Sequence, residues 1–287
     1  MIVLANISTD GGSTWMTTNC NECKAGESAD YLYEGEEPTP PTPPTPGGEG
    51  DTFVRHHVVM DFTGAWCTNC PDGVNTLNNV IKTMQGEETI HVIALHDNTG
   101  GGDPMATPLT NTIFDDFNLN AYPSFVINLE EGGTLTSEWS KLRTYLREAS
   151  KESDCGIAIT TDYDASSRNG SATVKVKTAN GGNYRVSLFL LEDGVVSPQK
   201  HGSLTREDYI HNHVMRQMLS TTYQGDRLGE LAAGQELSKS YNYSIGSDYA
   251  AENCTFCALA IDNETGFVVN VAVCSATGGS ADYDTVK

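Results

Sequence analysis

The spacing of apolar residues changes about halfway along this 287-residue chain, and that change constrains the fold more than any other feature. From Arg55 to about Lys151, strand-like and helix-like spacings alternate in the order βαβαββα, which indicates an α/β layer. Beyond this stretch, apolar residues recur at every second position in short segments separated by turns, which is typical of an antiparallel β-sandwich. We therefore expect two globular domains, residues 52–153 and residues 154–287.

One segment of the second domain has a different spacing. Within residues 205–219, "TREDYIHNHVMRQML", the side chains of Ile210, Val214 and Met218 recur at the interval that stacks them on one face of a helix. We predict an inserted helix here, packed on the sandwich as a lid or a crossover. On such a helix the two histidines of "HNH" face different sides, which favours packing over a shared metal site.

A proline-rich run, "PTPPTPPTP" followed by glycines, occupies residues 38–51. Proline at this density excludes a helix or a central strand, so the run is predicted to be a semi-rigid linker. Residues 1–37 contain too few apolar residues to bury a core of their own. We interpret them either as the last hairpin of a truncated domain or as a tether in which Cys20 and Cys23 close a small loop.

The net charge of −21, from 17 basic and 38 acidic residues, argues against nucleic acid or an anionic membrane surface as a partner. No apolar run approaches the length of a membrane-spanning helix, and "MIVLANIS" lacks the basic start of a signal peptide. Eight cysteines are too few for a disulfide scaffold but favour an oxidising compartment such as a cell envelope. That location would require a leader that the chain as given does not contain.

The stretch "VMDFTGAWCTNCPDG", residues 59–73, places Cys67 and Cys70 between a predicted strand and a predicted helix. In the first turn of that helix, unpaired amides and the helix dipole would stabilise a Cys67 thiolate and lower its pKa. Cys67 is therefore predicted to be the attacking sulfur. Cys70, one turn further on, would be shielded and would resolve a mixed disulfide.

Three other residues have suitable chemistry to assist this pair. Trp66 can shield the sulfurs from bulk water. Asp61 points to the same end of the buried strand, and its carboxylate could accept the proton of Cys70. Pro123 stands directly before another apolar strand, in "AYPSFV".

The segment "VMDFTGAWCTNCP" resembles the active-site segment of the thioredoxin superfamily, and Tyr122-Pro123 resembles the cis-proline step of that family. The resemblance implies a thioredoxin-like fold for the first domain. It also implies a cis bond at Pro123, whose backbone would receive an extended substrate strand. The dipeptide Thr68-Asn69 and the residue Pro71 depart from thioredoxin itself, which leaves the fold expected and the redox potential open.

A second resemblance covers most of residues 55–275. Segments that include "TGAWCTNCPDG", "AYPSFVIN", "LFLLEDGVVSPQ" and "DYIHNHVMRQML" are similar, in order and spacing, to the outer membrane protein 28 family of Bacteroidetes. The resemblance implies an envelope lipoprotein in the outer membrane or periplasm, with surface exposure open. Such a protein would contact the membrane only through a lipid anchor, which is not evident in this chain.

Two functions follow as hypotheses. The first is thiol-disulfide exchange, with Cys67 as nucleophile, Cys70 as resolving thiol, and protein thiols, protein disulfides or an extended peptide as partners. The second is a non-catalytic adhesion or ligand-binding lipoprotein in which the thioredoxin-like layer is a rigid scaffold. Neither hypothesis requires a cofactor or a metal ion.

The remaining motifs carry plainer interpretations. The loop "DNTGGGDP" lacks the residues of a phosphate-binding loop and is interpreted as a flexible connection between two secondary-structure elements. Cys254 and Cys274 flank a predicted hairpin and would be opposite each other if its turn were centred on Glu264, so that a disulfide could join them. Cys155 and Cys257 are then expected to be free and buried.

Overall fold

The computed structural model describes residues 3–7, 16–20, 51–84, 87–130, 134–136 and 139–287. The chain divides into two compact units, residues 1–43 and residues 44–287. In the first unit, β1 (Val3–Ile7) and β2 (Met16–Cys20) pair in an antiparallel sheet. The predicted proline-rich linker and the predicted Cys20–Cys23 loop both extend into residues outside the described ranges.

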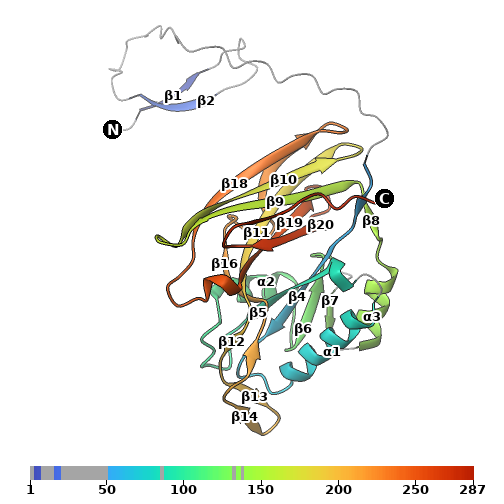
Figure 1. The fold of residues 1–287 in the computed structure, drawn as a ribbon, viewed down its shortest axis with the longest axis vertical. Coiled ribbons are helices and arrows are strands. Elements are labelled where there is room, and N and C mark those ends of the chain that lie inside the picture. Colours follow the sequence, from blue (N-terminus) through green and yellow to red (C-terminus); the bar gives the residue numbers. More distant parts are fainter. Residues whose placement is uncertain (1–2, 8–15, 21–50, 85–86, 131–133, 137–138) are drawn as a thin grey trace. The chain divides into compact units, whose positions relative to one another are not determined.

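The second unit begins with elements in the order that the apolar spacing predicts, from β4 to α3 (Figure 1). Helix α1 forms where Leu77 and Val80 recur on one buried face, with Pro71 in its first turn, a position that proline tolerates. These elements are β3 (Phe53–Val54), β4 (His57–Thr63), α1 (Cys70–Lys82), β5 (Ile90–His96), α2 (Pro108–Asp116), β6 (Ser124–Ile127), β7 (Thr134–Thr136) and α3 (Trp139–Glu148).

The rest of the second unit consists mainly of strands. They are β8 (Glu152–Ser153), β9 (Cys155–Asp164), β10 (Asn169–Thr178), β11 (Gly182–Glu192), β12 (Val195–Val196), β13 (Gln199–His201), β14 (Leu204–Arg206), β15 (Ile210–His211), β16 (Val214–Met218), β17 (Asp226–Leu231), β18 (Glu236–Ser244), β19 (Cys254–Asp262), β20 (Val268–Ser275) and β21 (Gly279–Ala281). The unit is thus rich in β-sheet and has few helices within its described residues. None of those helices is long and apolar enough to cross a membrane.

Two large sheets organise these strands. A four-stranded sheet has the order β18-β10-β9-β21, and a nine-stranded sheet has the order β20-β19-β11-β16-β5-β4-β6-β7, with β17 also paired to β11. Within the larger sheet β4 and β5 are parallel, whereas β6 runs antiparallel to β4. Strand β16 pairs with β5 in parallel, at Val214 and Ala94. The α/β elements and the later strands therefore share one sheet.

Three large apolar clusters fill the layers. One lies between the two sheets and includes Val174, Leu188 and Phe256. A second combines residues of the α/β strands, such as Phe62 and Ile93, with residues of later strands and with Ile113 on α2. The third packs α1 and α3 against the other face of β4, β5 and β6 through Leu77, Val80, Phe125, Leu142 and Leu146. Two of the three clusters thus anchor the elements that flank the cysteine pair.

The helix predicted at residues 205–219 is wrong, because the segment forms β14, β15 and β16. Ile210 pairs with Val196 and is 59% exposed, whereas Val214 is fully buried, so their four-residue spacing reflects no common face. The backbone turns between them at His213, which has a positive φ of 58°. His211 bonds to the Ser197 carbonyl oxygen and His213 to Asp193, so the two rings do not share a site.

The cysteines of the later strands are free. Cys155, Cys254, Cys257 and Cys274 are all buried and unbridged. Cys274 lies opposite Phe256 rather than Cys254, because the hairpin pairs Ile261 with Val268 next to its turn and a β-bulge at Ala260 then shifts the register by one more residue. Burial raises the pKa of the Cys257 thiol to about 12 and that of Cys274 to about 11, so these thiols stay protonated and unreactive near neutral pH.

The buried side chain of Asn270 links segments of the backbone that are far apart in the sequence. Its buried amide accepts from the His56 backbone N–H and donates to the carbonyl oxygens of Val54 and Cys155, at 2.8 to 3.1 Å. Asn270→Ala should lower the free energy of unfolding by at least about 2 kcal/mol, because each buried group left unpaired costs roughly 1–3 kcal/mol. Denaturant titration checks this, with the exposed Asn242→Ala as control. Equal midpoints for the two variants would contradict it.

Candidate functional site

A disulfide joins Cys67 and Cys70, with Cα atoms 5.4 Å apart. Strand β4 ends at Thr63, a short loop follows, and α1 begins at Cys70 with Asn69 as its N-cap. Cys70 thus holds the first helical position, and Cys67 precedes the helix rather than lying in its first turn. Both residues are largely buried, with exposed fractions of 5% for Cys67 and 1% for Cys70. Cys67 is the more accessible of the two.

Pro123 packs on the first turn of this helix. The Tyr122–Pro123 peptide bond is cis. A Cβ atom added at Gly73 would lie 2.4 Å from Cγ of Pro123, so the proline ring rests directly on the helix backbone. Only glycine leaves room for this contact. The fold therefore brings Pro123 to the helical turn that starts at Cys70.

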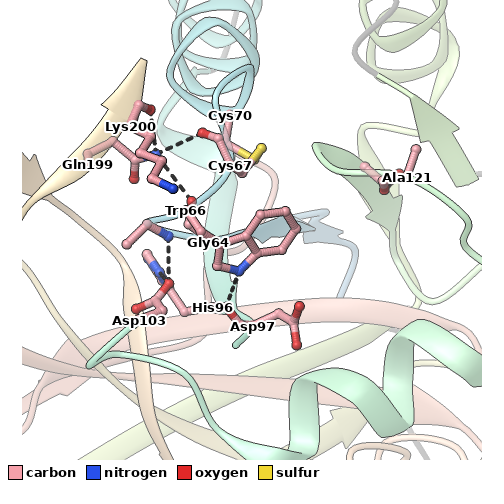
Figure 2. The surroundings of a disulfide bond; sticks show 12 residues. Gly64, Trp66, Cys67, Cys70, His96, Asp97, Asp103, Ala121, Gln199 and Lys200 are labelled. Carbon is pink, nitrogen blue, oxygen red and sulfur yellow. Dashed lines mark hydrogen bonds and ion pairs between the residues drawn. A yellow bond between two sulfur atoms is a disulfide. The ribbon is translucent and has the colours of Figure 1, made fainter. Parts of the chain in front are cut away.

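Trp66 is held by the glycine-rich loop that follows β5. Its indole Nε1 donates to the Asp97 carbonyl oxygen at 2.8 Å (Figure 2). A Cβ atom at Gly100 would lie 2.3 Å from the indole ring, so the loop backbone lies against the ring. The sequence predicts that the loop "DNTGGGDP" is only a flexible connection, but the loop contacts Trp66 and so forms part of the site.

Asp61 lies on β4 and is buried, with an exposed fraction of 2%. Among the described residues, its Oδ1 atom has no hydrogen-bond partner. Burial raises the pKa of this carboxyl from 3.8 to about 7. The group can therefore gain or lose a proton near neutral pH. No hydrogen bond between described residues joins Asp61 to either cysteine.

Asp103 is a second buried carboxyl near the loop, and the sequence reasoning missed it. Its Oδ2 accepts hydrogen bonds from the Ala65 backbone N–H at 2.7 Å and from His96 Nδ1 at 2.8 Å, and its Oδ1 accepts from the Met105 N–H. Burial raises the pKa of Asp103, but these hydrogen bonds outweigh burial and lower it overall. Asp103 therefore stays ionised and fixes Ala65, two residues before Cys67.

The loop is also clamped by an arm, defined here as residues 195–211, which spans β12 to β15. Gln199 Nε2 donates to the carbonyl oxygens of Gly64 and Cys67 at 3.1 and 3.0 Å (Figure 2). The Lys200 N–H donates to the Ala65 carbonyl oxygen, and the Gly202 N–H to that of Thr68. The later half of the chain thus contacts the cysteine loop directly. No local sequence signal marks Gln199, because its partners lie more than a hundred residues away.

Of the residues predicted for the site, Cys67, Cys70, Trp66 and Pro123 are connected through α1 and its preceding loop. Asp61 lies on the strand that leads into that loop. Within the described part of the chain, no group of three or more His, Cys, Asp or Glu side chains is placed to hold a metal ion. The arrangement combines one cysteine pair, joined here as a disulfide, with the carboxyl of Asp61, whose pKa is raised to about 7.

Comparison with known proteins places this geometry in context. A family model described as "Outer membrane protein Omp28" matches residues 110–276. HBP35 of Porphyromonas gingivalis is similar in structure, with a TM-score of 0.66 and 17% identity over 78% of this chain and 76% of that chain. At this identity the similarity concerns the fold alone.

Two further solved structures match less well. A domain of the outer membrane lipoprotein Omp28 from Porphyromonas gingivalis has 22% identity and a TM-score of 0.31, over 44% of this chain and 89% of that chain. Protein AGR_C_4864 from Agrobacterium tumefaciens has 11% identity and a TM-score of 0.48, over 78% of this chain and 96% of that chain. No curated protein matches the chain.

The contact between Gly73 and Pro123 predicts that replacing this helical glycine with alanine lowers the stability of the protein. Glycine to alanine in a helix normally stabilises by about 1 kcal/mol. Gly73→Ala should instead destabilise by about 1–3 kcal/mol, because its Cβ would collide with the Pro123 ring. Thermal unfolding measures the change, and the exposed Asn78→Ala in the same helix should stabilise slightly. A more stable Gly73→Ala protein would disprove the packing.

The raised pKa of Asp61 predicts that the stability of the protein depends on pH. Because its pKa is higher in the folded chain than the ordinary 3.8, the stability due to its protonated form is present below about pH 4 and is lost as the pH rises through about 7. Asp61→Asn should therefore be more stable than the wild type by roughly 3–5 kcal/mol at pH 8 and about equal at pH 4. Urea titrations at both pH values test this. A difference independent of pH would contradict it.

Proposed function

The chain belongs to the outer membrane protein Omp28 family, and from this premise we propose that it exchanges disulfides with other proteins of the cell envelope through Cys67 and Cys70. Family membership supports the envelope location, where disulfides persist. The family match begins at Thr110, beyond both cysteines, so support for the exchange itself comes from the site.

A thioredoxin-like arrangement of β4 to α3 is part of this proposal. It is supported by the parallel pair β4 and β5, the antiparallel β6 and β7, and the cysteine pair between β4 and α1. The observation that supports exchange best is the position of the disulfide at the start of α1, with Pro123 packed on the same turn. Helix amides stabilise a thiolate at this position.

The proposed step starts from the disulfide. A thiolate of the partner attacks Sγ of Cys67, the bond between Cys67 and Cys70 breaks, and Cys70 leaves as a thiolate that takes up one proton. A second partner thiolate then attacks the partner sulfur of the mixed disulfide and releases Cys67 as a thiolate. The partner gains a disulfide and loses two electrons, which the cysteine pair receives. The reverse sequence reduces a partner.

The neighbouring residues have separate tasks in this proposal. Asp61, with its pKa of about 7, donates the proton to the Cys70 thiolate and takes it back in the reverse direction. Trp66 covers the pair on the side of the glycine-rich loop. The backbone at Pro123 is the platform for an extended partner segment.

Equilibration in defined glutathione buffers, followed by alkylation and mass spectrometry of the peptide with both cysteines, tests the proposal. The pair should titrate reversibly with a midpoint between about −270 and −120 mV, the range of known exchange proteins. Cys257→Ser, which removes a buried thiol elsewhere, should leave the midpoint unchanged. A pair that stays oxidised in dithiothreitol while the protein remains folded would rule exchange out.

One observation favours a second function. The two cysteines are nearly buried, whereas the arm exposes the large apolar residues Val196, Leu204 and Ile210 at 65%, 69% and 59%. Val196 and Ile210 are paired across β12 and β15, so two of these exposed apolar side chains lie next to each other, as on an interaction surface. The second proposal is a non-catalytic adhesion or ligand-binding lipoprotein in which the disulfide only fixes the loop beneath the arm. An irreducible pair would favour this function.

A further inference from the structure

A cavity of about 390 Å³ is lined in part by Trp66 and Tyr122 and has no part in the exchange step described above. Its size falls within the range of ligand pockets. Two of its lining residues adjoin the site in sequence: Trp66 precedes Cys67, and Tyr122 precedes Pro123. The lining consists of Trp66, Thr99, Asn111, Phe114, Asp115, Asn120 and Tyr122.

Aromatic rings form the walls of the cavity. The rings of Phe114 and Tyr122 stack with centroids 4.7 Å apart and an angle of 8° between their planes. The indole of Trp66 meets Tyr122 at 5.3 Å with an angle of 74°. The indole and the stacked pair therefore form two walls at a corner. Aromatic faces carry partial negative charge and attract cations, most strongly at tryptophan.

The charges around the cavity have the same sign. Asp115 lines it, and the lining contains neither lysine nor arginine. Asp97 is 1% exposed, and its Oδ1 atom has no hydrogen-bond partner among the described residues. Burial raises the pKa of Tyr122 most, followed by the charge of Asp97, a hydrogen bond with Asp97 and the charge of Asp115, so both carboxylates lie within electrostatic range of the Tyr122 hydroxyl.

We propose that this cavity binds the lysine or arginine side chain of a polypeptide whose cysteine reacts at Cys67. The inference rests on the proposed exchange function and adds a substrate class to it. A segment extended along Pro123 with its own cysteine at Cys67 lies next to Trp66 and Tyr122, which line the cavity, so a neighbouring side chain of that segment reaches it. A basic side chain suits it because its aliphatic stem contacts the rings while its charge faces Asp115. An acidic side chain would be repelled.

Binding can be measured without any exchange. The oxidised full chain is titrated calorimetrically with peptides in which serine replaces the cysteine and lysine, norleucine or glutamate stands at successive positions beside it. Norleucine keeps the aliphatic stem and lacks the charge. At the best position, lysine should bind about threefold to tenfold more tightly than norleucine, and glutamate should bind most weakly. Asp115→Asn should reduce the preference, whereas Glu264→Gln, which removes one charge from an exposed turn, should not.

Exchange is read separately in a Cys70→Ser variant. Two competing peptides, one with lysine and one with norleucine, carry their cysteine as a mixed disulfide with thionitrobenzoate. The Cys67 thiolate attacks the sulfur of the peptide cysteine. A disulfide forms between Cys67 and the peptide, and thionitrobenzoate leaves as a thiolate. Mass spectrometry gives the ratio of the two adducts, which should favour lysine by the same factor as binding.

The two readouts separate the two proposals. Equal affinities and equal adducts for lysine and norleucine would overturn the cavity proposal and leave exchange standing. A lysine preference in binding that Asp115→Asn reduces, together with no adduct of either peptide, would support a site for basic side chains and overturn exchange. A preference that Asp115→Asn leaves intact would overturn the assigned cation site.

Discussion

The pairing of β16 with β5 is the contact on which the rest of the second unit depends. It consists of a short parallel bridge at Val214 and Ala94, with the Ala94 N–H donating to the His213 carbonyl oxygen at 2.8 Å. Through this bridge the strands of the α/β part and those of the later part form one sheet (Figure 1). A shared apolar cluster, from Phe62 on β4 to Leu259 on β19, stabilises it. Because the arm directly precedes β16 in the chain, the same bridge delivers Gln199 to the cysteine loop.

Much of the α/β part could be predicted from the sequence, because its signals are local. The apolar spacing of α1 and the motif around Cys67 and Cys70 each lie within a few residues. The contacts that complete the site are not local: Gln199 meets the Cys67 carbonyl across 132 positions. The helix predicted at residues 205–219 is wrong because apolar spacing alone does not distinguish a helix from short irregular strands. The partners of these strands, Val196 and Ala94, are remote in the sequence. The register of Cys274 depends on a bulge that no residue type marks.

Asp61 and Asp103 show why residue type alone could not assign roles within the site. Both carboxyls are buried near the same loop. Asp103 receives hydrogen bonds from two backbone N–H groups and one imidazole, which lower its pKa, whereas Asp61 receives no partner at Oδ1 and burial raises its pKa to about 7. The first carboxyl is therefore a permanent anion that holds the loop. Only the second can exchange a proton near neutral pH. The environment, rather than the sequence, divides the two tasks.

The arm also closes one edge of the cysteine loop. Its hydrogen bonds occupy the carbonyl oxygens of Gly64, Ala65, Cys67 and Thr68, so this edge of the loop is closed to another chain. In Figure 2 Gln199 and Lys200 lie on one side of Cys67, and the exposed Ala121, two residues before Pro123, lies on the other. The exchange proposed above therefore brings an extended segment to Cys67 from the side of Pro123 rather than from the side of the arm. The residues that match the family model, 110–276, include the arm and Pro123 but neither cysteine. The family match therefore concerns the arm and the strands around it, and the exchange proposed above rests on the geometry of the cysteine pair itself.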